Sequence, residues 1–125
     1  MGGGLIFTEA SWIRETGLGA IAWVGDKGDG NVNKFAYCLY GSSPTLVEAM
    51  GIWAATKWAT DKGWEDTTIV TDSENLVRWI NMDVNPDKEC IPIVEQIIKL
   101  FREKHSFNLR KGTKHQVKQA HALGK

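Results

Sequence analysis

The sequence predicts a mixed α/β domain in which a five-stranded sheet, three antiparallel strands followed by two parallel ones, is flanked by helices. Three observations carry this prediction. The first 41 residues hold three β-rich runs separated by turns, residues 67–72 form a β-branched run that passes directly into a helical pattern, and residues 91–105 repeat apolar side chains at helical spacing. A strand that feeds a helix this abruptly is typical of an α/β unit with parallel pairing.

The N-terminal third is predicted to be an antiparallel meander. The runs LIFTEASW, GLGAIAWVG and VNKFAYCLYG alternate with the turn-like segments RETG and DKGDGN. The leading MGGG, residues 1–4, is expected to be a flexible start or an artificial addition. We therefore expect a single domain over residues 5–125.

A long helix should follow the meander. Ser43 is placed as its N-cap and Pro44 as its first residue, where the missing N–H of proline costs nothing, and the helix should run to about Gly63. One apolar stripe is predicted to pack inward, formed by Leu46, Met50, Trp53 and Ala54.

The second half supplies the parallel part of the sheet. The strand TTIVTD ends in Asp72, and the helix SENLVRWIN follows, with Ser73 or Asp72 as its cap. After the polar segment MDVNPDKEC comes a helix over IPIVEQIIKLFREKH, whose predicted apolar face is Ile93, Ile97, Leu100 and Phe101. FNLRKG is the predicted last strand and QVKQAHALGK a short C-terminal helix.

Composition limits the possible functions. With 125 residues, 42% of them hydrophobic, the chain is long enough for one core. Fifteen basic and fifteen acidic residues cancel, so no overall charge draws the chain to nucleic acid or membrane. Cys38 and Cys90 form neither a CxxC pair nor a disulfide framework, and no apolar run is long enough to span a membrane. These features predict an intracellular protein, cytoplasmic or nuclear, without membrane contact.

Three carboxylates are placed to meet in the predicted sheet. If the first and fourth strands are neighbours, Glu9 in mid-strand and Asp72 at a strand end face one region, and Glu48, early in the intervening helix, leans over it. Three carboxylates so close repel one another unless a cation lies between them. Oxygen ligands without cysteine favour Mg²⁺ or Mn²⁺ over zinc, and two such ions about 4 Å apart support phosphodiester hydrolysis in nucleases.

Each carboxylate also has an ordinary interpretation. Glu9 fits the solvated face of an edge strand, Glu48 fits a charge near a helix N-terminus, and Asp72 fits a helix N-cap. Only the combination of the three favours a functional site.

The motifs FTEASW, SSPTLVEAM, IVTDSENLVRWI and AHALGK, in this order, resemble the ribonuclease H-like superfamily, and more narrowly the reverse-transcriptase-like ribonuclease H domains of plants and retroelements. The resemblance covers Leu5 to Lys125. It implies a ribonuclease H-like fold, two Mg²⁺ (or Mn²⁺) ions held by Glu9, Glu48 and Asp72, and His121 as the last site residue. His121 would act as a base or proton shuttle; its alternative is a surface histidine.

The sequence departs from the family pattern at two places. Glu9 stands where the family has Asp, and the extra methylene can displace a metal ion by about an ångström, a misplacement that can cost about a hundredfold in rate. Val117 stands where the family usually has Asn. Substrate positioning or the last strand and loop are therefore expected to differ.

Several further residues are candidates for substrate contact. Ser11 is placed to approach the RNA sugar, Ser73 lies beside Asp72, and Lys114 and Lys118 could track phosphates or form a solvated face. Trp12 is the tryptophan closest to the site, although packing is favoured for it. Trp53 and Trp79 are predicted to belong to the core. MDVNPDKEC is short and not basic, so the substrate-gripping handle that some family members carry is expected to be absent.

The first functional hypothesis is a metal-dependent endonuclease that hydrolyses the RNA strand of RNA–DNA hybrids. The second is a catalytically weak or inactive ribonuclease H-like module that binds nucleic acid or protein, which Glu9 and the altered segment before His121 favour. A third differs in context more than in chemistry: a domain of a larger reverse-transcriptase polypeptide. A monomer is expected.

Overall fold

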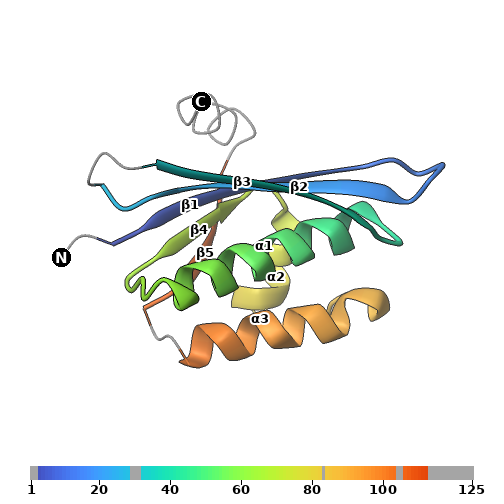
Figure 1. Cartoon of the computed structure of the whole chain (residues 1–125). Helices are drawn as coiled ribbons and strands as arrows, with labels where there is room; N and C mark the ends of the chain where they lie inside the picture. Colours follow the sequence, from blue (N-terminus) through green and yellow to red (C-terminus); the bar gives the residue numbers. More distant parts are fainter. Residues whose placement is uncertain (1–2, 29–31, 83, 104–105, 113–125) are drawn as a thin grey trace.

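The protein folds into a five-stranded sheet, and the helices among the described residues pack on one face of it (Figure 1). The computed structural model describes residues 3–28, 32–82, 84–103 and 106–112. The strands are β1 (Leu5–Trp12), β2 (Leu18–Asp26), β3 (Val32–Tyr40), β4 (Thr68–Thr71) and β5 (Asn108–Lys111). The helices are α1 (Pro44–Asp61), α2 (Glu74–Asn81) and α3 (Ile91–Glu103), with a 3-10 turn, η1 (Lys88–Cys90), before α3. The predicted C-terminal helix lies outside the described residues.

The sheet has the order β3-β2-β1-β4-β5. β1 pairs antiparallel with β2, and β2 with β3, whereas β4 pairs in parallel with both β1 and β5. The predicted mixed sheet, with its three antiparallel strands and two parallel ones, is confirmed. β1 is thus the central strand, which corrects the interpretation of Glu9 as part of an edge strand.

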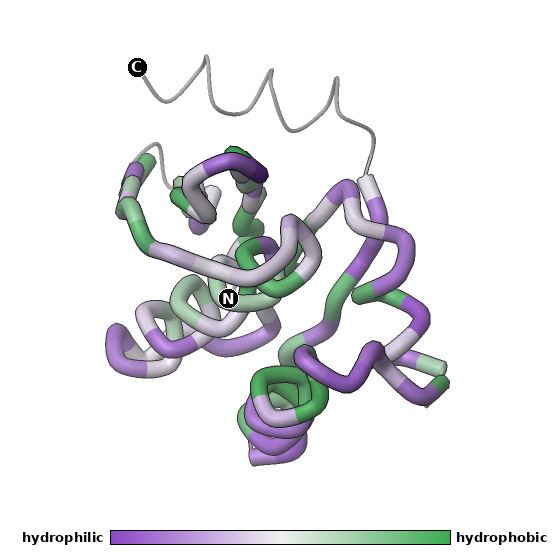
Figure 2. The backbone as a smooth tube through the Cα atoms, turned by 90° about the vertical axis from the view of Figure 1, so that its right-hand side faces the viewer, coloured by the Kyte–Doolittle hydropathy of each residue, from purple (hydrophilic) through white to green (hydrophobic). Residues whose placement is uncertain are grey.

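The core lies between the sheet and the helices. Alternate residues of the strands face it, among them Ile6, Ile21, Trp23 and Ile69, all at most 4% exposed. Figure 2 views α3 nearly end-on at the bottom of the molecule, with its hydrophobic side turned toward the rest of the chain and its hydrophilic side outward. None of the helices within the described ranges has the length and apolar character that crossing a membrane requires.

The start of α1 confirms the predicted cap. The Ser43 hydroxyl accepts a hydrogen bond from the Leu46 N–H at 3.2 Å, and Pro44 is the first helical residue. The predicted inward stripe is confirmed only in part: Leu46, Trp53 and Ala54 pack against the core, but they do not form its centre. Leu46, Met50, Trp53 and Ala54 are only partly buried, and the fully buried positions are Val47, Ala49, Gly51, Ile52, Ala55, Thr56 and Ala59.

The physical reason is that α1 is covered on two sides, by the sheet and by α3. Small residues line its sheet-facing side; a Cβ on Gly51 would lie 3.3 Å from Ile21. On α3 the buried residues are Val94 and Ile97, so only Ile97 of the predicted face is fully buried. Trp79 is buried as predicted, and Trp53 is partly buried and packs against the core.

Hydrogen bonds hold β4 and β5 to neighbouring parts of the fold. Gly4 belongs to the four residues expected to form a flexible start, yet it is buried and its carbonyl accepts a hydrogen bond from the Thr68 N–H at 2.9 Å. At β5, the Asn81 side chain at the end of α2 donates to the Leu109 carbonyl at 2.8 Å. These contacts hold β4 and β5 against the rest of the fold.

Both cysteines are free thiols, as the sequence predicted. Cys38 is exposed on β3, and Cys90 is buried at the end of η1. Burial, with smaller contributions from the charges of Glu89 and Asp87, raises the pKa of the Cys90 thiol to about 11. Cys90 is therefore an unreactive core residue at neutral pH.

Candidate functional site

The parallel pairing of β1 with β4 brings two predicted site carboxylates to one level of the sheet. The register aligns Leu5 with Thr68 and Phe7 with Val70. Glu9 and Asp72 each lie two residues beyond the last of these pairs, Glu9 within β1 and Asp72 just after the end of β4. β4 ends at Thr71, whereas β1 continues beyond that level to Trp12. Glu9 therefore lies beside the end of β4.

The ordinary interpretation of Asp72 is excluded by the cap of α2. Ser73 is the N-cap residue, and its hydroxyl accepts from the Leu76 N–H at 3.4 Å. The Ser73 N–H in turn donates to the Thr71 hydroxyl at 3.2 Å. Asp72 therefore does not cap the helix; it is a half-buried carboxylate at the turn from strand to helix.

Glu48 is the fifth residue of α1, which has no acidic residue in its first turn. One of its carboxylate oxygens, Oε2, is shielded from solvent, and the side chain as a whole is half-buried. A carboxylate that only favoured the helix dipole would be solvated in the first turn. This burial distinguishes Glu48 from the solvated charge that the sequence left as its alternative.

The start of α1 is held by two glycines that sequence reasoning missed. A Cβ on Gly19 would lie 2.9 Å from Val47 Cγ1, and one on Gly41 would lie 2.6 Å from Val47 Cγ2. Val47 is fully buried and directly precedes Glu48, so this contact fixes where Glu48 leaves the helix. Glycine inside or just after a strand pattern signals close approach of another element, and that signal was available in the sequence.

Trp12, the last residue of β1, is hydrogen-bonded to the segment that leads into α1. Its indole Nε1–H donates to the Gly41 carbonyl at 2.9 Å, and the Gly41 N–H donates to the Gly17 carbonyl at 2.9 Å. The ring packs against the core, as the sequence favoured. Ser11, one residue earlier, is exposed.

Basic side chains lie next to the Asp72 end of the sheet. Arg110 and Lys111 are exposed on β5, aligned with Val70 and Thr71 of β4. The remaining predicted residues, Lys114, Lys118 and His121, lie outside the described residues. The structure thus brings Glu9 and Asp72 to one level of the sheet, and nothing is placed for the C-terminal three.

The donor chemistry of Glu9, Glu48 and Asp72 fits a hard divalent cation, since all the ligand atoms would be carboxylate oxygens. Among the residues that the structure describes, however, no three His, Cys, Asp or Glu side chains are already gathered around one point. The register places Glu9 and Asp72 at one level of the sheet, and Glu48 lies on a separate element, α1.

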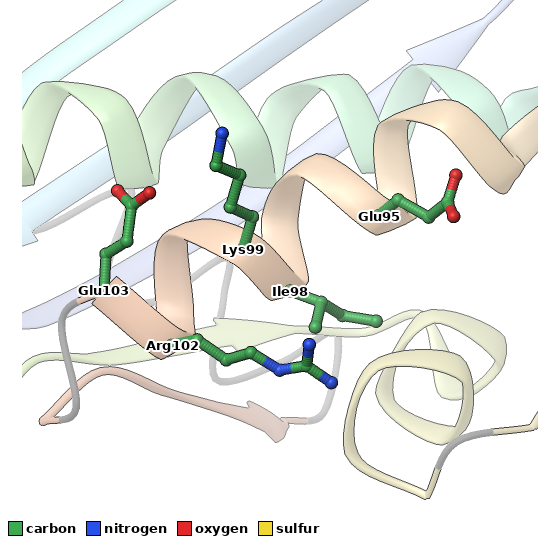
Figure 3. A pocket seen from close by; sticks show the side chains of 5 residues that line it. All are labelled: Glu95, Ile98, Lys99, Arg102 and Glu103. Atoms are coloured by element: carbon green, nitrogen blue, oxygen red, sulfur yellow. The ribbon is translucent and has the colours of Figure 1, made fainter.

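A hollow on the surface of α3 lies apart from these three carboxylates. A shallow hollow of about 590 Å³ is lined by five residues of α3, and Figure 3 shows their side chains spread along one helix rather than converging: Glu95, Ile98, Lys99, Arg102 and Glu103.

Comparison with known proteins identifies the family of the chain. The family model described as reverse transcriptase-like matches residues 7–125, nearly the whole chain. The chain belongs to the reverse transcriptase-like family. The resemblance found in the sequence motifs is confirmed.

Solved ribonuclease H structures share the fold of this reverse transcriptase-like domain. The ribonuclease H1 of the archaeon Halobacterium salinarum NRC-1 superposes with a TM-score of 0.85 at 17% identity, covering 98% of this chain and 94% of that one. The compost-derived LC11 ribonuclease H1, in complex with an RNA/DNA hybrid, gives a TM-score of 0.81 at 15% identity, covering 96% and 92%. Such low identities establish the ribonuclease H-like fold and nothing finer.

A viral relative places the same fold in a longer polypeptide. The foamy viral protease-reverse transcriptase, in complex with an RNA/DNA hybrid, gives a TM-score of 0.75 at 16% identity, covering 98% of this chain and 19% of that one. A search of curated protein sequences finds no match.

Proposed function

We propose that this reverse transcriptase-like domain is a metal-dependent endonuclease that hydrolyses the RNA strand of RNA–DNA hybrids. The observation that carries the proposal is the parallel register that brings Glu9 and Asp72 to one level at the end of β4. Its context supports it: the family match spans residues 7–125, and similar folds in the LC11 enzyme and the foamy viral protein are found with RNA/DNA hybrids.

In this proposal Glu9, Glu48 and Asp72 hold two Mg²⁺ or Mn²⁺ ions. When bound, such ions supply an activated water and stabilise the leaving oxygen of a phosphodiester. The protein contributes ligand positions from three separate elements, β1, α1 and the turn after β4. His121 would move a proton near the reacting phosphate, because an imidazole side chain can both accept and donate one.

The substrate would be held by groups around this end of the sheet. Ser11 is exposed and would approach the RNA sugar, whose 2′-hydroxyl distinguishes RNA from DNA. Trp12 already donates its only N–H, at Nε1, to the Gly41 carbonyl. It could therefore contact substrate only through its ring. Ser73, Lys114 and Lys118 would contact phosphates, the lysines as charges and Ser73 through its hydroxyl hydrogen.

The test is cleavage of an end-labelled RNA–DNA hybrid with Mg²⁺ and then Mn²⁺. Asp72→Asn keeps the size of the side chain and removes its charge. It should lower the cleavage rate by more than about a hundredfold, which exceeds the usual effect of changing a residue that only hydrogen-bonds to a metal ligand. Glu95→Gln on the outer face of α3 is the matched control and should retain full activity. An unchanged Asp72→Asn rate would refute the assignment of the site.

The Glu9→Asp variant tests the departure from the family pattern. If the longer side chain displaces an ion, Glu9→Asp should raise the cleavage rate, by up to about a hundredfold.

A second candidate function is a catalytically inactive binding module. Glu9 in place of Asp favours it, as does the finding that no three possible metal ligands lie together among the described residues. It predicts no cleavage by either the parent chain or Glu9→Asp, and no saturable change of tryptophan fluorescence on Mn²⁺ titration.

A further inference from the structure

The outer edge of β3 is an unusually open surface for strand pairing. β3 is the first strand of the sheet order and pairs with β2; on its other side the described residues place no strand (Figure 1). Its nine residues, VNKFAYCLY, contain no proline and a single charge, Lys34. Three of its large apolar side chains are exposed: Tyr40 at 74%, Tyr37 at 54% and Val32 at 41%.

The register shows which backbone groups face outward. Gly41 lies opposite Gly17, one step beyond the Tyr40–Leu18 pair, and its N–H donates to the Gly17 carbonyl. Odd-numbered residues of β3 therefore direct their N–H and C=O groups toward β2, because these directions alternate along a strand. The even-numbered residues present theirs to the open edge: Val32, Lys34, Ala36, Cys38 and Tyr40.

These groups are self-complementary in one particular alignment. In an antiparallel pair of two identical strands, a twofold axis at Ala36 aligns all nine residues of each copy, and any other centre leaves residues unpaired. Ala36 is itself an outward-facing position, so the axis passes through a hydrogen-bonded pair. The smallest side chain of the strand lies at the axis, where two identical side chains must meet.

The side chains fit this alignment as well. Val32 lies opposite Tyr40 of the second copy, which covers the two exposed apolar ends of the strand. Lys34 lies opposite Cys38 of the second copy, and therefore no like charges face each other. On the helix side, Tyr37 lies opposite Phe35 of the second copy, next to the existing stack of Trp23 on both rings.

We propose that two copies of this chain associate through β3, antiparallel and centred on Ala36, into one continuous sheet. This departs from the monomer that the sequence predicted. Nine residues a side is well below the roughly 20 to 30 of a standard stable interface, so the dimer forms and separates with concentration. Lys34 at the edge limits further, less specific pairing.

Cysteine cross-linking tests the register directly. In a Cys38→Ser background, Ala36→Cys places two thiols across the axis at about 5.5 Å between Cα atoms, within disulfide reach, and mild oxidation should give a covalent dimer. Val32→Cys in the same background is the matched control. Its two thiols would be eight residues apart, about 27 Å, and oxidation should give no covalent dimer.

A second variant tests association without cross-linking. Ala36→Pro removes an outward-facing N–H and leaves the hydrogen bonds between β2 and β3 intact, since proline is tolerated on strand edges. Sedimentation equilibrium should show the parent dimerising with rising concentration and Ala36→Pro staying monomeric with an unchanged near-ultraviolet spectrum. A parent that is monomeric up to about 1 mM, or a Val32→Cys variant that cross-links as readily as Ala36→Cys, overturns the proposal.

Discussion

The contact between Gly41 and Val47 gives the sharpest prediction about stability. A Cβ at residue 41 would lie 2.6 Å from Val47 Cγ2, a separation that real Cβ atoms essentially never show, and Val47 is fully buried. Gly41 does not have a positive φ, so Gly41→Ala introduces overlap rather than backbone strain. We expect it to destabilise the fold by about 1–3 kcal/mol, the usual cost of overpacking.

The double variant separates this clash from other effects. Val47→Ala alone should cost about 2 kcal/mol, because it leaves a cavity. In Gly41→Ala/Val47→Ala the new methyl enters that space, and the double variant should be at least about 1 kcal/mol more stable than the sum of the single changes.

Urea unfolding followed by tryptophan fluorescence measures all four corners of the cycle. For a chain of this size, each kcal/mol corresponds to about 3–6 °C in melting temperature, which gives an independent check. Additivity within about 0.5 kcal/mol would refute the claim that Gly41 and Val47 are in steric contact.

Three further perturbations follow from contacts described above. Trp12→Phe removes the 2.9 Å hydrogen bond to the Gly41 carbonyl and should cost about 1 kcal/mol in urea unfolding; no loss would mean that water replaces the indole. Ser43→Ala removes the cap of α1 and should cost about 1 kcal/mol by the same assay, whereas Ser43→Gly should cost only a few tenths. The folded state favours the protonated Cys90 thiol. Its contribution to the free energy of unfolding should therefore be fully present below about pH 9 and be lost between pH 9 and 11, by at most about 1.4 kcal/mol per pH unit. Cys90→Ala should remove that component of the pH profile, and a thiol reagent at pH 8 should modify Cys38 alone until the protein unfolds; equal labelling of both thiols would contradict the burial of Cys90.

The sequence predicted the sheet well because its strands and caps are locally encoded. The meander, the Ser43 cap and the passage from β4 into α2 each depend on a few neighbouring residues, although β4 ends at Thr71 rather than at Asp72 and the choice between Ser73 and Asp72 as the cap was left open. Periodicity found only part of the buried surface of α1, because it detects one apolar face, whereas this helix is covered by both the sheet and α3. The glycines at 19 and 41 signalled a close approach, but that Val47 is the residue in contact with both depends on tertiary packing, which spacing in the chain does not give.

The candidate site shows the same division. The sequence shows the types and order of Glu9, Glu48 and Asp72, and the strand–helix unit predicted parallel pairing, but the register comes from the structure. Their side-chain arrangement could not be anticipated, because rotamers depend on neighbours and on whatever charge is bound between them.

The central position of β1 also affects how the chain is made. β1 bonds to β4 over a long separation; the Thr8 hydroxyl donates to the Val70 carbonyl 62 residues away. At about 5–20 residues per second, β4 leaves the ribosome roughly 3 to 12 seconds after β1. During that interval the meander β1–β2–β3 has two open edges, and only one of them, β1, will be covered when folding finishes. A chain that has not yet reached residue 72 lacks Asp72, one of the three carboxylates of the candidate site.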